Sequence, residues 1–378
     1  MVFGIPLEFL LLGLTLLGVA IFHEHPLIVS LSGLTSLIIL KGTQGFDFGH
    51  HLHAEASLIL NLFGLLLGFA VLARHFESSG LPDFMPRLLP DNWLGPFFLL
   101  VMVFCLSTFL DNIAAALIGG TVALTVFKGK VHIGYLVALT AASNAGGAGS
   151  VLGDTTTTMM WIAGIPAGKV LPAFIGSGTA LFCFGIPAAL QQDRFQAILR
   201  DPLPGTRIEW KRISLTAAVL IAAAVANLCF GLPALGVWSV LLLALPLVPM
   251  PWKILGPAAR GAGFLSALVL CASLMPVETL PLASWKSTLA IGFVSAFFDN
   301  IPLTRLALDQ GGYDWGMLAY AVGFGGSMLW FGSSAGVALS GQYPQVRSVG
   351  LWLKHGWHVV IAYGVGFTVM LALAGWHP

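Results

Sequence analysis

Charged side chains are scarce in this chain of 378 residues, of which Asp, Glu, Lys and Arg together make up 9%. A typical soluble domain carries roughly 25%. Hydrophobic residues make up 57%, far more than one soluble core of this size needs. The composition therefore predicts a membrane protein that contacts lipid along its whole length and has no separate soluble domain. The net charge of +1 gives no indication of a nucleic-acid partner.

Cysteine is also scarce, and basic residues are missing from the first 22 positions. The cysteines lie in apolar segments, which predicts small packing residues rather than a disulfide framework or a metal site. They are Cys105, Cys183, Cys229 and Cys271. A signal peptide begins with a basic region, whereas residues 2–22 carry Glu8 and no Lys or Arg. We therefore expect a first helix that is retained.

Long apolar runs recur along the sequence, most of them approaching the roughly 20 residues that a membrane-spanning helix needs. They lie at about 5–22, 26–41, 56–74, 93–127, 133–164, 168–190, 213–230, 234–248, 258–275, 286–308, 316–341 and 353–375. A charged stretch at 191–212 divides them into two equal sets. This arrangement predicts a first repeat over 1–190, a linker over 191–212 and a second repeat over 213–378.

Two motifs recur in the same order in both halves. Residues 107–113 read STFLDNI and residues 295–301 read SAFFDNI, which are identical at five of seven positions. Further along, residues 146–154 read GGAGSVLGD and residues 325–333 read GGSMLWFGS. Because two motif pairs in one order are hard to obtain by chance in apolar sequence, they favour an internal repeat.

Polar and glycine-rich positions interrupt four of the apolar runs. An Asp-Asn pair in 93–127 and another in 286–308 predict two re-entrant hairpins with Asp-Asn at the tip, because broken backbone is tolerated at membrane depth where it lines a cavity. The glycines predict that 133–164 and 316–341 are each one helix unwound near its centre. The predicted fold is an all-α polytopic membrane protein with about ten spanning helices and two hairpins.

The positions of Lys and Arg predict the orientation in the membrane. With the linker in the cytoplasm, thirteen of the 17 basic residues face inward. Those on the outer side are Lys41, Lys169, Lys286 and Arg305. Both termini are then periplasmic, in the inner membrane of a bacterium, and the two hairpins enter from opposite faces. Inverted repeats with paired broken elements are the architecture of secondary transporters.

Asp111 and Asp299 are the main functional candidates, because a carboxylate at membrane depth is costly unless it is paired or liganded. A carboxylate that holds either a proton or a sodium ion, but not both, is the simplest chemistry for antiport. Neighbouring side chains offer further oxygen ligands for a hard cation. These are Asn112, Asn300, Ser107 and Ser295. The alternative interpretation is that Asp-Asn only caps the N-terminus of a half-helix.

Asp154 and Thr155 follow the first unwound stretch and offer another cation ligand or the coupling proton site. The alternative role for Asp154 is plain N-capping of the second half-helix. Ser333 holds the equivalent position in the second half, so the two half-sites are not equivalent. Glycines in both stretches let the backbone approach an ion, or let helices pack tightly. They include Gly146, Gly147, Gly325 and Gly326.

The Asp-Asn motifs and the stretches that follow them resemble the NhaD-type sodium/proton antiporters. The similarity covers roughly residues 56–378 and includes 144–161 and 325–338. That family belongs to a wider ion transporter superfamily with arsenite permeases and citrate and dicarboxylate carriers. The resemblance implies a homodimer in which a transport domain carrying both hairpins moves against a scaffold domain in an elevator-like fashion.

The same resemblance implies cation sites between each hairpin tip and the facing unwound helix. Carried over to this sequence, Asp111 and Asn112 lie near 146–150, and Asp299 and Asn300 lie near 325–327. Sodium is the implied ion at these four side chains. Two further polar residues of the matched stretches join the candidate cation and proton ligands. They are Asn144 and Ser327.

Two local features differ from that family. Ile113 and three alanines follow the first Asp-Asn, where relatives tend to have threonines. Arg305 and Asp309 lie four residues apart where the family is mostly apolar. They either pair with each other at the outer surface, or Arg305 turns inward and offers its guanidinium to an anion. A histidine cluster is expected in a solvated outer loop. It comprises His50, His51 and His53.

The leading hypothesis is a secondary transporter, not an enzyme, that exchanges sodium or lithium for protons through Asp111, Asp299 and Asp154 without a cofactor. The alternative is a carrier of a small anion such as citrate, another carboxylate or arsenite, with half-helix N-termini facing the anion. A remote alternative is an intramembrane aspartyl protease, in which paired aspartates share a proton. Residues 152–154 faintly resemble the Gly-x-Gly-Asp signature of such enzymes, but Val151 stands where the first glycine belongs.

Overall fold

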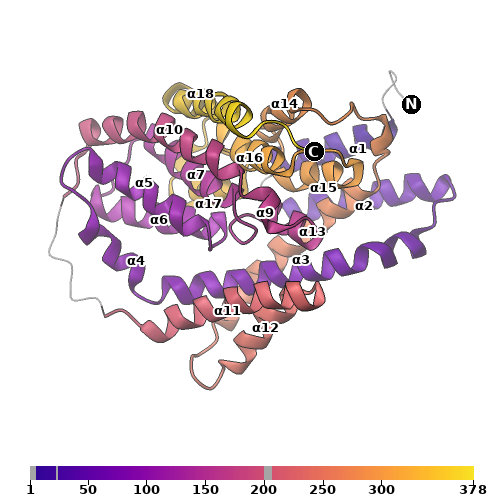
Figure 1. The fold of residues 1–378 in the computed structure, drawn as a ribbon, viewed down its shortest axis with the longest axis horizontal. Coiled ribbons are helices and arrows are strands. Elements are labelled where there is room, and N and C mark those ends of the chain that lie inside the picture. Colours follow the sequence, from indigo (N-terminus) through magenta and orange to yellow (C-terminus); the bar gives the residue numbers. More distant parts are fainter. Residues whose placement is uncertain (1–5, 23, 200–206) are drawn as a thin grey trace.

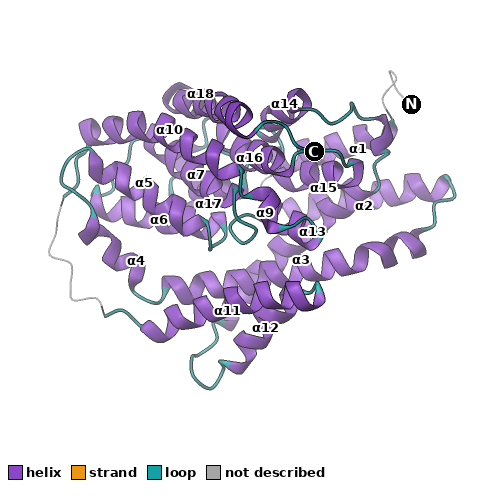
Figure 2. Ribbon diagram, in the orientation of Figure 1, coloured by secondary structure: helices purple, strands orange, loops and turns teal. Residues whose placement is uncertain are grey.

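The computed structural model describes residues 6–22, 24–199 and 207–378, and within these ranges helices are the only regular elements (Figures 1 and 2). Residue 5 of the predicted first segment and residues 200–206 of the predicted linker lie outside the described residues. Six helices in the described part are long and apolar enough to cross a membrane. They are Pro26–Thr43, Phe48–Glu77, Ala167–Phe195, Trp210–Phe230, Trp252–Ser273 and Val349–Ala374. The prediction of a polytopic membrane protein is confirmed.

The number of long spans is smaller than the ten that the sequence predicts. Other apolar helices in the described part are too short to cross a bilayer alone, namely Leu7–Ile21, Leu94–Ser107, Asn112–Val126 and Pro233–Leu243. The last of these has 11 residues, which at 1.5 Å per residue reach about 16 Å. The predicted span at 234–248 is therefore a short helix followed by turns.

One group of helices is built around the 30-residue helix α3. It contains α1 (Leu7–Ile21), α2 (Pro26–Thr43), α3 (Phe48–Glu77), α11 (Trp210–Phe230), α12 (Pro233–Leu243) and α13 (Leu255–Ser273). Figure 1 shows α11 and α12 lying along α3. Leu65, Val71 and Leu72 of α3 form a buried apolar cluster with Val219 of α11 and Val237 of α12. A second small cluster joins α1, α2 and α13.

The other helices share one large hydrophobic core that includes residues from both halves of the chain. From the first half come α4 (Leu81–Phe84), α5 (Leu94–Ser107), α6 (Asn112–Val126), α7 (Ile133–Ala148), α8 (Thr155–Ile162), α9 (Ala167–Val170) and α10 (Ala173–Phe195). From the second half come α14 (Trp285–Ser295), α15 (Asn300–Gln310), α16 (Trp315–Gly325), α17 (Ser334–Gln342) and α18 (Val349–Ala374). The rings of Phe184 of α10 and Phe324 of α16 stack with centroids 5.8 Å apart and so join the first half to the second. The two halves are thus packed into one body.

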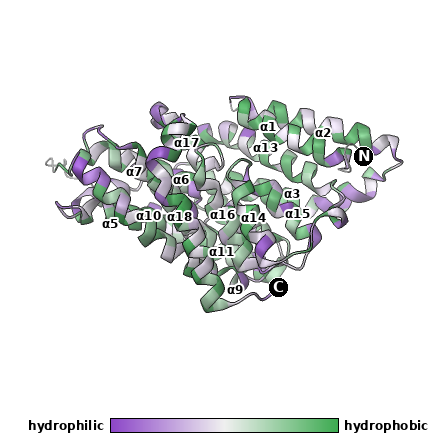
Figure 3. Cartoon of the chain, turned by 90° about the horizontal axis from the view of Figure 1, so that it is seen from above, coloured by the Kyte–Doolittle hydropathy of each residue, from purple (hydrophilic) through white to green (hydrophobic). Residues whose placement is uncertain are grey.

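Apolar side chains cover much of the outer surface. Hydrophobic residues run along the outward faces of α1 and α2 in Figure 3, and Leu14, Ile28 and Ile39 on these helices are exposed. On α11 and α12 the same is true of Leu228 and Leu243. A soluble protein rarely leaves contiguous apolar surface of this kind uncovered, so these faces suit the lipid contact that the composition predicts.

The predicted outer loop around the histidine cluster is wrong. Helix α3 begins at Phe48, eight residues before the predicted start of that segment, and it includes His50, His51 and His53. Asp47 starts the helix, because its Oδ1 accepts a hydrogen bond from the backbone N–H of His50 at 3.0 Å. The His51 ring lies 3.0 Å (Nε2 to Oγ) from Ser273 of α13. At least this histidine is a packing residue between helices and not part of a solvated loop.

Candidate functional site

The two Asp-Asn pairs lie at turns between consecutive helices. Helix α5 ends at Ser107 and α6 begins at Asn112, so Asp111 is the last residue of the first turn. Helix α14 ends at Ser295 and α15 begins at Asn300, which places Asp299 in the same position of the second turn. Both residues thus lie at helix–turn–helix breaks, where the sequence predicts hairpin tips.

The two glycine-rich stretches also interrupt helices as predicted. Helix α7 ends at Ala148 and α8 begins at Thr155. Helix α16 ends at Gly325, a short 3-10 turn follows, and α17 begins at Ser334. A side chain at Gly147 would lie 2.6 Å from the carbonyl oxygen of Gly153, and one at Gly326 would lie 2.7 Å from that of Gly332.

Neighbouring glycines pack against the hairpin arms. A side chain at Gly146 would collide with the carbonyl of Phe104 in α5, and one at Gly325 with the carbonyl of Gly292 in α14. These glycines are therefore needed for close packing of backbone on backbone. Of the two interpretations that the sequence left open for them, tight packing is the one that the structure supports directly.

Asp154 is the centre of the buried polar network. Its side chain is almost completely buried and accepts hydrogen bonds from Asn112 Nδ2 to Oδ1 at 3.2 Å and from Asn300 Nδ2 to Oδ2 at 3.4 Å. One carboxylate thereby binds the asparagines of both Asp-Asn pairs. Asp154 also caps α8, through the backbone N–H of Thr156 at 3.4 Å, and the Thr155 hydroxyl donates to it at 3.3 Å. Asp154 therefore caps α8, and this contact is compatible with the predicted role as a cation or proton ligand.

Asn144 extends the network to the second broken helix. Its Oδ1 accepts from Asn112 Nδ2 at 3.1 Å, and its Nδ2 donates to Ser327 Oγ at 2.9 Å and to Ser333 Oγ at 3.0 Å. Asn144, Ser327 and Ser333 are all buried. The candidates that entered only through the family resemblance thus lie together with Asp154, at the point where α7 meets the 3-10 turn and the start of α17.

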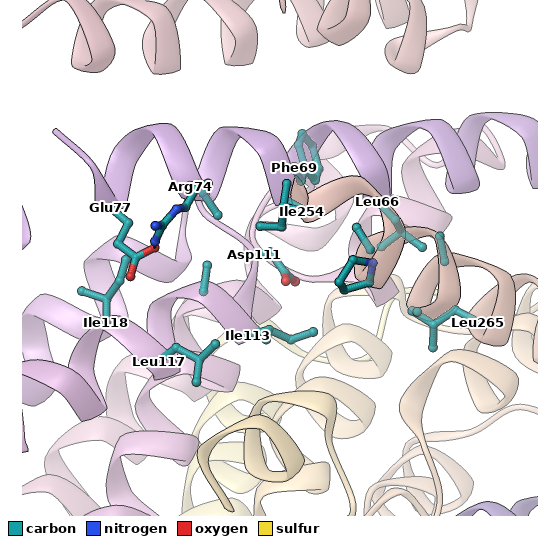
Figure 4. Close-up of a pocket in the computed structure, with 17 residues that line it drawn as sticks. Leu66, Phe69, Arg74, Glu77, Asp111, Ile113, Leu117, Ile118, Ile254 and Leu265 are labelled. Carbon is teal, nitrogen blue, oxygen red and sulfur yellow. The ribbon is translucent and has the colours of Figure 1, made fainter. Parts of the chain in front are cut away.

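Asp111 and Asp299 stand at the edge of this network and face two cavities. A cavity of about 350 Å³ lies between α3, α6 and α13 and is lined by Asp111, together with Arg74 and Glu77 at the end of α3 (Figure 4). A second cavity of about 270 Å³ is lined by Asp299, Ser333 and Ser334. Ile113, Gly261 and Leu265 line both cavities and separate them. An ion reaching either aspartate from one of these cavities would next meet the amides that bind Asp154.

The two aspartates differ in their local partners. Asp299 caps α15, because its Oδ1 accepts from the backbone N–H of Ile301 at 3.0 Å, and the Ser334 hydroxyl donates to Oδ2 at 3.4 Å. Asp111 makes no side-chain cap on α6, and its buried Oδ1 has no hydrogen-bond partner among the described residues. The simple capping interpretation therefore holds for Asp299 and fails for Asp111. Sequence reasoning did not select Ser334 as a ligand, although its place directly after Ser333 was a usable signal.

The remaining predicted ligands are two serines near the hairpin tips. Ser295 Oγ donates to the carbonyl oxygen of Val322 in α16 at 2.7 Å. Ser107 Oγ and Thr156 Oγ1 are buried and have no hydrogen-bond partner within the described residues. Buried hydroxyls normally have a partner, so these two oxygens fit a site that is completed by a cation or by water. No group of three or more His, Cys, Asp and Glu in the described ranges could hold a metal ion.

The electrostatic character of the site is purely acidic. Among the described residues, Asp111, Asp154 and Asp299 make no ion pair with Lys, Arg or His. Arg305 is buried on α15 and does pair with Asp309, as the four-residue spacing predicts, at 2.6 Å from Nη2 to Oδ1. It also binds Glu55 of α3 at 2.8 Å, a partner that the sequence could not indicate because 250 residues separate the two.

Comparison with known families decides the affiliation. The family model described as "Citrate transporter" matches residues 16–325. This chain belongs to that family. The citrate transporter model covers both Asp-Asn motifs and the first broken helix, and it extends to Gly325 at the end of α16. Membership agrees with the ion transporter superfamily that the motifs resemble.

Curated relatives of this citrate-transporter family member are named for a different cargo. "Sodium/proton antiporter 1" of Arabidopsis thaliana is 26% identical over 86% of this chain and 64% of its own length. "Na(+)/H(+) antiporter NhaD" of Halomonas elongata is 26% identical over 72% of this chain and 66% of its own length. The protein of the same name from Alkalimonas amylolytica is 27% identical over 75% and 68%. The chain spans about two thirds of the length of these relatives.

Proposed function

We propose that this protein is a secondary transporter that exchanges sodium or lithium for protons across the inner membrane of a bacterium. The observation that carries the proposal is the acidic network, in which Asp154 binds Asn112 and Asn300 while Asp111 and Asp299 face cavities. Carboxylate, amide and hydroxyl oxygens are ligands that suit a hard cation. Each carboxylate holds a proton or a cation, but not both, which makes the two cargoes compete.

The anion carrier is the weaker candidate, although the family's description names citrate. An anion entering the site would meet three carboxylates, and the basic side chain that lines the first cavity, Arg74, is already paired with Glu77. Arg305, the one guanidinium that the sequence offered to an anion, is already bound by Glu55 and Asp309. Bringing like charges together without a counter-ion is unfavourable at low dielectric. The printed names of the relatives also favour antiport.

The two groups of helices support the proposed elevator-like movement. Both Asp-Asn turns and both broken helices belong to the body with one large core, whereas α1–α3 and α11–α13 have smaller clusters of their own and meet that body in a small apolar cluster that includes Leu62, Leu265 and Ile301. We propose that the first body carries the cation and moves against the second, and that the matching breaks at Asp111 and Asp299 are the tips of hairpins in two inverted repeats. A homodimer with periplasmic termini remains part of the proposal.

The test is dissipation of a pH gradient in everted membrane vesicles from a bacterial strain that lacks its own antiporters. Sodium, lithium, potassium and citrate are added separately. We expect a response to sodium or lithium that Asp111→Asn and Asp299→Asn both lose. The control is Asp83→Asn, which removes an exposed carboxylate on α4 and should leave the response unchanged.

The outcomes separate the hypotheses. Dissipation by citrate alone would replace antiport by the anion carrier. A sodium response that survives both substitutions would remove these carboxylates from the mechanism. Expression and membrane insertion of each variant are checked by immunoblot, so that a missing protein is not read as a missing activity.

A further inference from the structure

A buried ion cluster joins the two groups of helices on the opposite side from the cavities. Arg305 Nη2 of α15 donates to Glu55 Oε1 of α3 at 2.8 Å, and Arg305 Nε donates to Asp309 Oδ2 at 3.0 Å. Glu55 and Arg305 are each 8% exposed. Within this cluster, the Glu55 contact is the one that crosses between the two groups of helices, because Arg305 and Asp309 lie on the same helix; apolar contacts such as Leu265 with Ile301 also cross.

The charges of this cluster do not balance. Two carboxylates share one guanidinium, and Glu55 Oε2 is buried with no hydrogen-bond partner among the described residues. The other titratable or charged groups close by are His51, one turn earlier on α3, and Lys41 at the end of α2, where it pairs with Glu8 at 3.4 Å. A buried ion pair that is incompletely hydrogen-bonded contributes little to the stability of the fold. The cluster therefore points to a role other than holding the two groups of helices together permanently.

The position of the cluster along α3 is informative. Glu55 and Arg74 are 19 residues apart on this helix, which corresponds to about 28 Å, close to the thickness of a bilayer core. Arg74 lies at the end of the first cavity, and both it and Glu77 have half-exposed side chains. The cavity therefore approaches the surface at the end of α3 that is far from Glu55.

The second cavity lies toward that same far end. It is lined by Val19 and Ala20 near the end of α1, whereas Glu8 at the start of α1 binds Lys41. Lys41 is near the end of α2, which leads into α3 within a few residues. The start of α1 is thus beside the ion cluster, and Val19 and Ala20 are on the opposite side. Both aspartate cavities therefore lie toward one end of the molecule, and the ion cluster lies toward the other.

We propose that Glu55, Arg305 and Asp309 form an outer latch, which holds α15 against α3 while the cavities are open and which must release whenever the site is exposed to the opposite side. Asp309 competes with Glu55 for the guanidinium and keeps the latch weak enough to open. Arg305 is thereby a positioning residue and not a cargo ligand. This inference rests on the proposed movement of one helix group against the other.

The two carboxylates provide a matched pair of variants with opposite expected effects. Glu55→Gln removes the charge that crosses between the groups, while Arg305 stays neutralised by Asp309, so the chain should fold. Asp309→Asn removes the competitor and leaves the guanidinium to Glu55. We expect the first variant to favour the released state and the second to favour the latched state.

The readout is the rate at which a maleimide modifies single cysteines in vesicles, in a background where the four native cysteines are replaced. Ala258→Cys reports the first cavity, which it lines, and Ser273→Cys reports the latch end of the same helix, where Ser273 contacts His51. With Glu55→Gln we expect labelling to fall at 258 and rise at 273, each roughly tenfold, as for loss of one charge-assisted hydrogen bond. With Asp309→Asn both changes should have the opposite sign.

Labelling needs no cargo, so it separates this inference from the proposed function. A wild type without sodium exchange refutes the proposed function, while the labelling pattern still decides about the latch. Equal effects of the two variants, or no change with Glu55→Gln in a protein that elutes normally from a sizing column, would overturn the latch.

Discussion

Replacing Asp154 by asparagine changes the site at the one carboxylate that both Asp-Asn pairs share. The wild-type carboxylate accepts from the amides of Asn112 and Asn300 through different oxygens. An asparagine offers one oxygen and one NH2 group. The side-chain NH2 group of either Asn112 or Asn300 would then face another hydrogen-bond donor instead of an acceptor. A hydrogen bond to a charged acceptor is worth about 1.5–3 kcal/mol, and each 1.4 kcal/mol is a factor of ten. We expect Asp154→Asn to reduce sodium-dependent exchange roughly a hundredfold at subsaturating sodium.

The control for this prediction is Thr155→Ala. It removes a neutral hydroxyl that donates to the same carboxylate at 3.3 Å but keeps the charge and both amide contacts. Because the carboxylate keeps its charge and its donors from Asn112, Asn300 and the Thr156 backbone, we expect the exchange to fall less than tenfold. Initial rates of pH-gradient dissipation over a range of sodium concentrations measure both variants. The reasoning is refuted if Asp154→Asn stays within tenfold of wild type, or if Thr155→Ala is equally damaging.

Two further predictions concern packing and competition. Gly147→Ala and Gly326→Ala each place a methyl group 2.6–2.7 Å from a carbonyl oxygen. Each should lower the free energy of unfolding by roughly 1–3 kcal/mol and so lower the midpoint of thermal unfolding in detergent. The control is Gly178→Ala, where the added methyl group has nothing within 4 Å and should not lower the midpoint. Because protons and sodium compete for the same carboxylates, acidifying the medium should raise the sodium concentration for half-maximal exchange and leave the saturating rate less affected; a purely saturating-rate effect would argue against shared ligands.

The sequence predicted the breaks of the helices better than it predicted the contacts between them. An Asp-Asn pair or a glycine run inside an apolar segment is conspicuous, because neither suits a lipid-facing helix, and Asp111, Asp299 and the glycines were found in this way. That Asn112 and Asn300 both reach Asp154 depends on packing between distant segments, which no local pattern records. The ion pair between Glu55 and Arg305 was not predicted for the same reason.

Local capping explains the main error in the helix boundaries. The polar stretch before residue 56 contains charged and histidine residues that suggest a loop, but Asp47 caps a helix that begins directly after it. The sequence signal was an N-cap residue, which is short-range and was outweighed by the polarity of the residues that follow. Hydropathy likewise could not reveal that α12 stops after 11 residues, since the apolar stretch continues through the turns beyond it.

Charge balance in the site gives a physical reason for coupling. Asp111, Asp154 and Asp299 have no basic partner among the described residues, and two of them face cavities while the third is buried between amides. Three ionised carboxylates so placed would repel one another and would each lose hydration, which at low dielectric costs several kcal/mol per charge. The site is therefore stable only when cations or protons offset part of this charge. In the proposed exchange, a sodium ion that leaves would have to be replaced by protons before the carrier closes. Closure that requires a neutralised site would by itself couple the two cargoes.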